Sequence, residues 1–112
     1  AAFSTNEIVV IDINHNALFA LKPQLPPNKS QSIHCLQSSD VKGLTKPQAL
    51  TVDNNDHLIV LDNKNIKVFN KKYMLLYQFK LSVRHFSPSS LAVDENNLIA
   101  VGYLEKPMIS LY

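Results

Sequence analysis

The chain is short of cysteine and glycine, and each shortage narrows the kinds of protein that it can be. Cys35 is the one cysteine among 112 residues, so no internal disulfide can stabilise the fold as it does in many small secreted domains. A reducing, cytoplasmic setting is therefore expected. With two glycines, the chain carries no glycine-rich loop for phosphates, and it has no serine or cysteine nucleophile motif.

Strong charge and long apolar runs are also missing. The net charge of +2 is too small to mark a nucleic-acid or membrane protein by itself. No apolar run approaches the roughly 20 residues that cross a bilayer, so no membrane partner is expected. The chain begins at Ala1 without a methionine, and we expect it to be cut from a longer protein. Hydrophobic residues make up 46% of the chain, which is enough to bury a core.

What the sequence does contain is an internal repeat. Residues 1–11 align without a gap to residues 91–101, and residues 50–61 form a middle copy with one extra residue in its turn. Asp53 and Asp94 are 41 residues apart, as are Pro47 and Pro88, whereas Val10 and Val60 are 50 apart. A period of about 40–45 residues is typical of the four-stranded blades of β-propellers.

Each copy predicts the same order of strands. Apolar runs at 8–11, 58–61 and 98–101 predict inner strands buried on both faces, each after a turn rich in Asn and Asp. Third strands are predicted at 18–21, 66–69 and 109–112. The outer strand of the middle copy is predicted at 73–80, where a helix is the competing interpretation, and residues 32–36 are a weaker candidate in the first copy.

The predicted fold class is therefore all-β, a β-propeller with blades of four antiparallel strands, of which about three are present. Residues 1–42 would form an incomplete first blade with a Pro-, Gln- and Ser-rich insertion at 22–39. Residues 43–82 would form a complete middle blade, and 83–112 a third blade without its outer strand. Three blades cannot close a ring, so we expect further blades from the parent chain or from a second copy, in a ring of six.

The middle copy resembles an NHL repeat, the propeller repeat found in tripartite-motif/NHL proteins. Residues 43–53 read GLTKPQALTVD, residues 57–62 read HLIVLD and residues 66–69 read IKVF. These match the family pattern of a Gly, a later Pro, strands that end in Val-Asp and in Asp, and a third strand like IQVF. The last copy, with Gly102 where an acidic residue is expected after Val101, is also similar to a WD40-like blade of a coat or tethering protein.

Catalytic and metal chemistry find little support in the residues. The four histidines are scattered and show no metal-ligand spacing, so neither a metal nor a cofactor is expected. Asp53 and Asp94 recur at equivalent places, which favours turn residues that bond local backbone amides over a catalytic pair. We therefore expect a protein that is not an enzyme, and a metal-dependent propeller enzyme is the weakest hypothesis.

Binding is the favoured function. Loops at one end of a propeller form a continuous face that suits partner binding. The resemblance to NHL domains implies single-stranded RNA or a protein as the partner, in post-transcriptional regulation, and the alternative is a protein-interaction propeller of a trafficking or scaffold complex. The predicted partner-binding residues are Asn14, His15, Lys64, Arg84, His85, Tyr103 and Lys106. Lys71 and Lys72 are predicted to occupy a hairpin tip at the opposite end, and Tyr73, Tyr77 and Phe79 to pack between blades.

Overall fold

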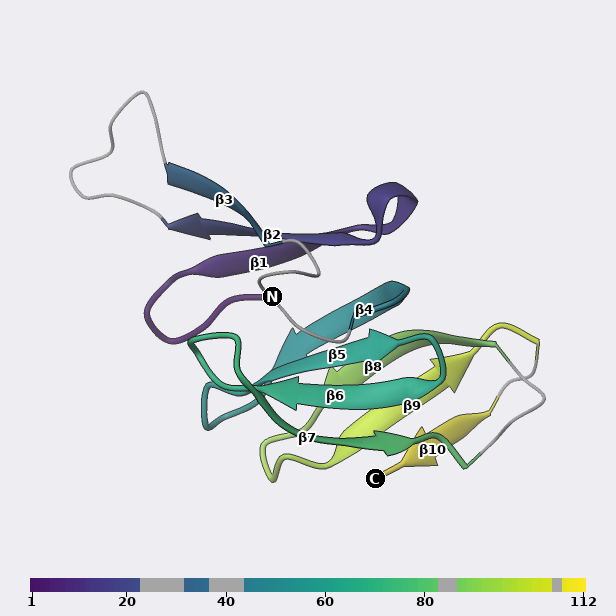
Figure 1. The fold of residues 1–112 in the computed structure, drawn as a ribbon. Helices are drawn as coiled ribbons and strands as arrows, with labels where there is room; N and C mark the ends of the chain where they lie inside the picture. The colour runs from purple at the N-terminus through teal and green to yellow at the C-terminus, as the bar shows by residue number, and fades with distance from the viewer. Residues whose placement is uncertain (23–31, 37–43, 83–86, 106–107) are drawn as a thin grey trace.

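The computed structural model describes residues 1–22, 32–36, 44–82, 87–105 and 108–112, and for Lys22 and residues 32–36 it describes the backbone alone. In these ranges the chain forms ten strands and one short 3₁₀ helix (Figure 1). The elements in chain order are β1 (Ile8–Asp12), η1 (Ile13–His15), β2 (Ala17–Lys22), β3 (Ser32–Leu36), β4 (Pro47–Val52), β5 (Leu58–Asp62), β6 (Asn65–Phe69), β7 (Leu75–Lys80), β8 (Pro88–Val93), β9 (Ile99–Tyr103) and β10 (Ile109–Leu111).

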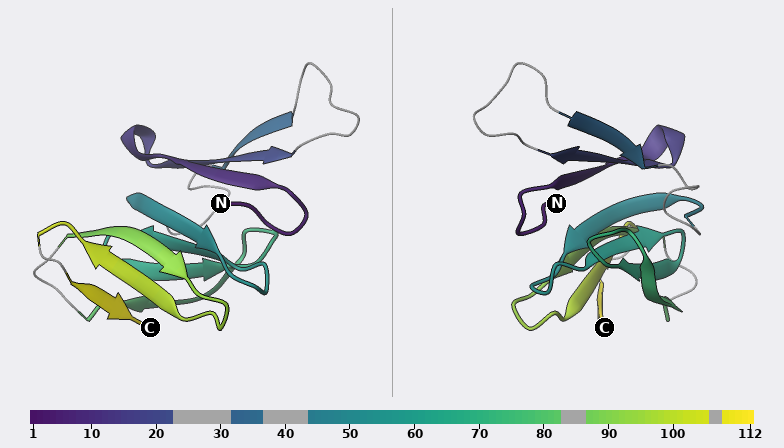
Figure 2. Two further views of the ribbon diagram at one scale, coloured as in Figure 1. Left: turned by 180° about the vertical axis from the view of Figure 1, so that it is seen from behind. Right: turned by 60° about the vertical axis from the view of Figure 1, so that its left-hand side comes forward.

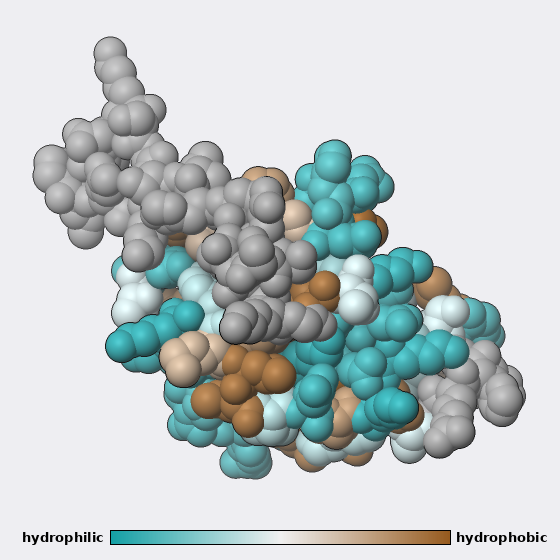
Figure 3. Space-filling model, viewed as in Figure 1, coloured by the Kyte–Doolittle hydropathy of each residue, from teal (hydrophilic) through white to brown (hydrophobic). Residues whose placement is uncertain are grey.

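The strands form three antiparallel sheets, each built from consecutive strands. Their orders are β1-β2-β3, β4-β5-β6-β7 and β10-β9-β8, so the middle sheet has four strands. In Figures 1 and 2 the sheets stand side by side in chain order, and β4 contacts both β1 and β8. The space-filling view from the same side shows hydrophilic residues over much of the coloured surface (Figure 3). The predicted all-β class, with blades of antiparallel strands, is confirmed. The blade boundaries at 42/43 and 82/83 touch residues outside the described ranges and stay a prediction.

The middle sheet is covered on both faces because successive side chains of a strand point to opposite sides. In β5, Leu58 and Val60 pack toward the first sheet, in a core that includes Val9. Ile59 and Leu61 pack toward the third sheet, in a core that includes Val101. Every residue of β5 is buried, as predicted for an inner strand sandwiched between neighbours.

The prediction of burial on both faces is wrong for β1. Val9 is fully buried, but Ile8 is 36% exposed and Val10 is 50% exposed. The cause is the position of the sheet: Val9 faces the middle sheet, while Ile8 and Val10 point to the other side, where no described element packs. A residue's burial is therefore set here by its neighbouring sheet as well as by its own hydrophobicity.

The predicted register of the third copy is also wrong by one residue. The same turn precedes the inner strand in each copy, and its fourth residue adopts a positive φ: Asn6, Asp56 and Asn97. Asp56 and Asn97 are 41 residues apart, so the middle turn carries no extra residue, and the strand that matches Leu58 begins at Ile99. Leu98 lies in the turn, not in the strand, and its side chain is 40% exposed.

The turns themselves confirm the structural interpretation of the two aspartates. The Asp53 carboxylate accepts hydrogen bonds from the backbone N–H groups of Asn55 (2.8 Å) and His57 (2.9 Å). Asp94 does the same for Asn96 (2.9 Å) and Leu98 (2.8 Å). Each carboxylate thus stabilises a tight turn before its inner strand.

The outer strand of the middle sheet is shorter than predicted. It begins at Leu75, because Tyr73 adopts a positive φ of 63° and closes a turn that starts at Asn70. The Asn70 side chain accepts hydrogen bonds from the backbone N–H groups of Lys72 (2.8 Å) and Met74 (3.0 Å). Lys71 and Lys72 therefore occupy a hairpin tip, as predicted.

The aromatic residues of this region differ in their packing. Tyr73 packs edge to face on Phe3 and donates a hydrogen bond to Glu7, and Phe79 packs on Tyr112. These two contacts join neighbouring sheets, as predicted. Tyr77 is exposed, because it lies on the edge strand β7, so its predicted burial between blades is wrong.

Candidate partner-binding face

The alternating direction of the strands brings three connections to one end of the sheets. They are the β1–β2 connection with Asn14 and His15, the β5–β6 turn with Asn63 and Lys64, and the β9–β10 connection with Glu105. Figure 1 shows them on the right-hand side. We call this the loop end. The opposite end, which carries the turns at 3–6, 53–56, 70–73 and 94–97, we call the turn end.

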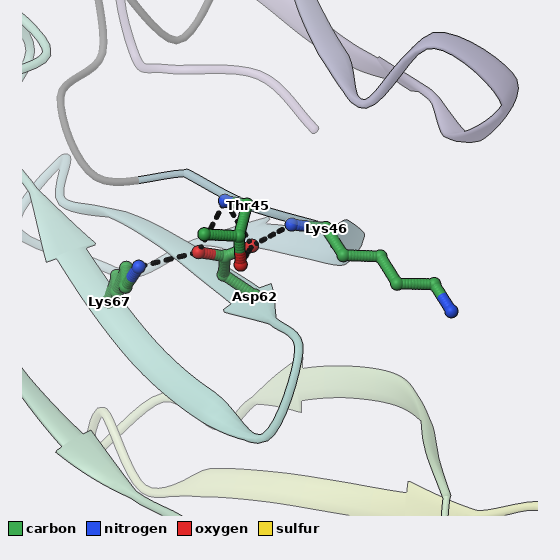
Figure 4. Close-up of polar contacts among 4 residues, drawn as sticks. All are labelled: Thr45, Lys46, Asp62 and Lys67. Atoms are coloured by element: carbon green, nitrogen blue, oxygen red, sulfur yellow. Dashed lines mark hydrogen bonds and ion pairs between the residues drawn. The ribbon is translucent and has the colours of Figure 1, made fainter.

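Asp62 organises the centre of the loop end. It ends β5 and is fully buried, and its carboxylate accepts hydrogen bonds from the backbone N–H groups of Thr45 (3.0 Å) and Lys46 (2.6 Å) (Figure 4). The buried ammonium group of Lys67 on β6 lies 2.5 Å from the same carboxylate. Asp62 thus ties the segment before β4 to the middle sheet, while the exposed Lys46 side chain extends away from it.

The other two acidic residues of the loop end also have local partners. Asp12 lies 2.7 Å from the Nδ1 atom of His15. Glu105 accepts a hydrogen bond from the backbone N–H of Ser87 (2.8 Å), which holds the pKa of this carboxyl below its usual value. The positive charge of Lys64 adds a smaller effect in the same direction.

Tyr103 is placed differently from the prediction. It is the last residue of β9, where it takes the position of Asp62, and it is only 8% exposed, so its predicted place in an exposed loop is wrong. Its hydroxyl donates a hydrogen bond to Ser110 (2.9 Å), and burial raises its pKa. The sequence pattern placed Gly102 at the position of Asp62, but in the structure Gly102 takes the position of Leu61.

The remaining predicted residues divide between the sheets. Asn14 and His15 are exposed on the first sheet, and no hydrogen bond or ion pair between described residues joins His15 to Lys64. Lys64 is exposed at the centre of the loop end. Arg84, His85 and Lys106 lie outside the described residues, and their part in binding stays a prediction.

A cavity beside Lys64 is lined in part by Lys80, a residue that the sequence pattern did not single out. It has a volume of about 460 Å³ and is lined by Asn63, Lys64, Asn65, Lys80 and Leu81. Lys80 pairs with Asn65 across β6 and β7, and the backbone N–H of Leu81 donates to the Lys64 carbonyl (2.9 Å). Lys80 could have been found only from the pairing register, because it is remote from Lys64 in sequence.

Charge is distributed unequally between the two ends. Among the described side chains, the loop end has four lysines, at 46, 64, 67 and 80, and three acidic groups, at 12, 62 and 105, a formal charge of +1. The turn end has two lysines, at 71 and 72, and five acidic groups, at 7, 53, 56, 94 and 95, a formal charge of −3. Lys71 is also paired with Asp56 at 3.5 Å. The loop end is therefore the positive end of the described molecule.

In the described part of the chain, no three His, Cys, Asp or Glu side chains gather in an arrangement that could hold a metal ion. None of the described helices has the length and apolar character to span a bilayer.

Comparisons with known proteins inform the fold alone. No family model matches the chain, and no curated protein matches it. Among solved structures, it is similar to a catalytically inactive virginiamycin B lyase from Staphylococcus aureus, crystallised with quinupristin, with a TM-score of 0.67 and 14% identity. The match covers 100% of this chain and 39% of the lyase chain. The chain thus has a β-propeller-like fold, of which it spans about three blades.

Proposed function

We propose that this chain is part of a non-catalytic binding propeller whose loop end binds an acidic segment of a protein partner. The observation that carries the proposal is the charge at that end: among the described residues, Lys46, Lys64 and Lys80 are exposed there, and the formal charge is +1 against −3 at the turn end. Charge of one sign on a face steers association with partners of the opposite sign.

Single-stranded RNA would use the same lysines, but it also needs aromatic rings on which its bases stack. Tyr103 is the one tyrosine among the predicted partner-binding residues, and it is buried with its hydroxyl bonded to Ser110. The described part of the loop end therefore offers cations and amides without an exposed aromatic ring. This chemistry favours an acidic protein segment over RNA.

The NHL assignment belongs to this proposal as well. Its pattern has a physical basis in the middle sheet, where Pro47 starts β4 and Asp62 ends β5. Asp62 accepts hydrogen bonds from Thr45 and Lys46, immediately before the proline, so the Pro and the Asp belong to one structural unit. The same contacts support an NHL-like blade and fix the backbone that carries Lys46.

The test compares the two ends of the molecule by fluorescence anisotropy. A short labelled peptide of Glu and Gly is titrated with the wild-type chain, with Lys46→Glu/Lys64→Glu at the loop end, and with Lys71→Glu/Lys72→Glu as the matched control at the turn end. We expect the loop-end variant to lose about tenfold or more in affinity, since each reversed charge turns attraction into repulsion. The control should bind as the wild type does.

A labelled oligouridine forms the second arm of the experiment. Equal losses in the two variants, or no binding of the peptide, would contradict the proposal. If the oligouridine bound and the peptide did not, the RNA alternative would replace it. Circular dichroism spectra of all variants show whether a loss of binding is a loss of folding.

A further inference from the structure

The cavity beside Lys64 is lined in part by polar side chains that do not contribute to the hydrogen bonding of the described part of the fold. Among the described residues, the carboxamides of Asn63 and Asn65 and the ammonium group of Lys80 make no hydrogen bond or ion pair with another side chain or with the backbone. All three line the same cavity as Lys64. Side-chain donors that converge on a concave site are the usual means by which a pocket orients a ligand.

The donor set selects for an anion with several oxygen atoms. The described lining residues carry two ammonium groups and two carboxamide NH₂ groups, and a lysine ammonium can donate but cannot accept. Among the described residues, the Asp62 carboxylate is held by the Lys67 ammonium group, and the Glu105 carboxylate accepts a hydrogen bond from the Ser87 N–H. A phosphate monoester carries a charge of about −1.5 to −2 and three strong acceptor oxygens, which matches two lysines and two amides.

The size and wall of the cavity indicate what carries the phosphate. Its volume of about 460 Å³ exceeds that of a phosphate group, so part of the carrier molecule would enter with it. Leu81, which is buried, supplies apolar surface on one side, and none of the described residues that line the cavity is aromatic. A serine or threonine side chain fits this wall better than a nucleobase, which would require a stacking partner.

We infer that this cavity binds the phosphate of a phosphorylated serine or threonine in the partner segment. The inference rests on the proposed function, because it gives the acidic segment a phosphorylated residue and a place on the loop end. Lys80 and Lys64 hold the phosphate oxygens, Asn63 and Asn65 donate amide hydrogen bonds, and the flanking acidic residues lie toward Lys46.

The experiment uses three versions of one short acidic peptide, with serine, phosphoserine or aspartate at the central position. Affinities are measured for the wild type, for Lys80→Gln and for Lys72→Gln, a matched loss of one exposed lysine at the turn end. The phosphoserine peptide should bind the wild type about tenfold more tightly than the serine peptide. Lys80→Gln should remove that gain, and Lys72→Gln should leave it intact.

Equal affinity of the wild type for the serine and phosphoserine peptides would overturn the inference, and so would an equal effect of the two substitutions. If the serine peptide still bound through Lys46 and Lys64, the proposed function would stand without the phosphate site. Tight binding of a 5′-phosphorylated oligouridine but not of the phosphopeptide would assign the cavity to nucleic acid instead. Inorganic phosphate, titrated while backbone amide resonances are recorded, gives a check that needs no peptide, because it should shift residues 63–65 and 80–81; an absence of shifts there would contradict the site.

Discussion

Replacing Asp62 by alanine should cause a large loss of stability. Asp62 is fully buried, and its carboxylate is 2.5 Å from the ammonium group of the buried Lys67. Its removal takes the Asp62 carboxylate away from that ammonium group in a site with little access to water. Breaking a buried ion pair from one side costs about 3–5 kcal/mol, because the remaining charge is no longer compensated.

The same substitution also removes the acceptor of two backbone donors. The N–H groups of Thr45 and Lys46 lose their bonds to Asp62, but both residues are exposed, so water can replace much of that interaction. The charge effect should therefore dominate. Since small domains are stable by about 5–15 kcal/mol in total, Asp62→Ala should leave a chain that is close to unfolding at room temperature.

The assay is urea unfolding followed by circular dichroism, with the double variant Asp62→Ala/Lys67→Met as the control. The double variant removes both charges and should lie within about 2 kcal/mol of the wild type, because the buried ammonium group and the buried carboxylate are removed together. The reasoning would be refuted if Asp62→Ala cost less than about 1 kcal/mol, or if the double variant were no more stable than the single one.

Three further predictions concern the turn end. Asp94→Ala should lower the free energy of unfolding by about 1 kcal/mol in urea denaturation, since two backbone N–H groups lose their acceptor; no change would show that the turn forms without it. Tyr73→Phe should cost a similar amount, about 1 kcal/mol, because the hydroxyl bond to Glu7 joins two sheets, and a thermal melt measures it. Hydrogen bonds from Ser4 lower the pKa of Asp56 from its ordinary value of 3.8. The ionised form of Asp56 therefore stabilises the fold above about pH 4, and this contribution is lost as the pH falls through the lowered pKa. The difference in unfolding free energy between the wild type and Asp56→Asn should close in that pH range, and a constant difference would count against the prediction.

Much of the fold could be predicted because the middle copy satisfies several independent signals. Its apolar run at 58–61, its flanking turn residues and its 41-residue spacing to the last copy all agree with one register. The last copy was harder. Leu98 extends the apolar run at 99–101, and hydrophobicity alone does not separate a turn residue from the strand that follows it. The constant spacing from Asp53 to Asp94 carries the correct register.

The candidate site was less predictable, for a reason that lies in the sheet. Lys64 sits in a turn that the sequence marks, whereas Lys80 reaches the same cavity through the pairing of β6 with β7, which no local pattern specifies. Tyr103 was assigned to a loop because of the one-residue error, although it occupies the strand position that Asp62 holds in the middle sheet. Tyr73 adopts a positive φ, a conformation that is rare for bulky residues. The Asn70 side chain stabilises the turn that holds Tyr73 in this conformation.

The most direct test of the central claim, that the loop end binds an acidic protein segment, is to map the contact on the molecule. Backbone amide resonances of the isotope-labelled chain are recorded with and without the acidic peptide. We predict that the shifts concentrate at Lys46, Asn63, Lys64 and Lys80, while the turns at 53–56 and 94–97 stay unchanged. Shifts confined to the turn end, or none at saturating peptide, would contradict the account.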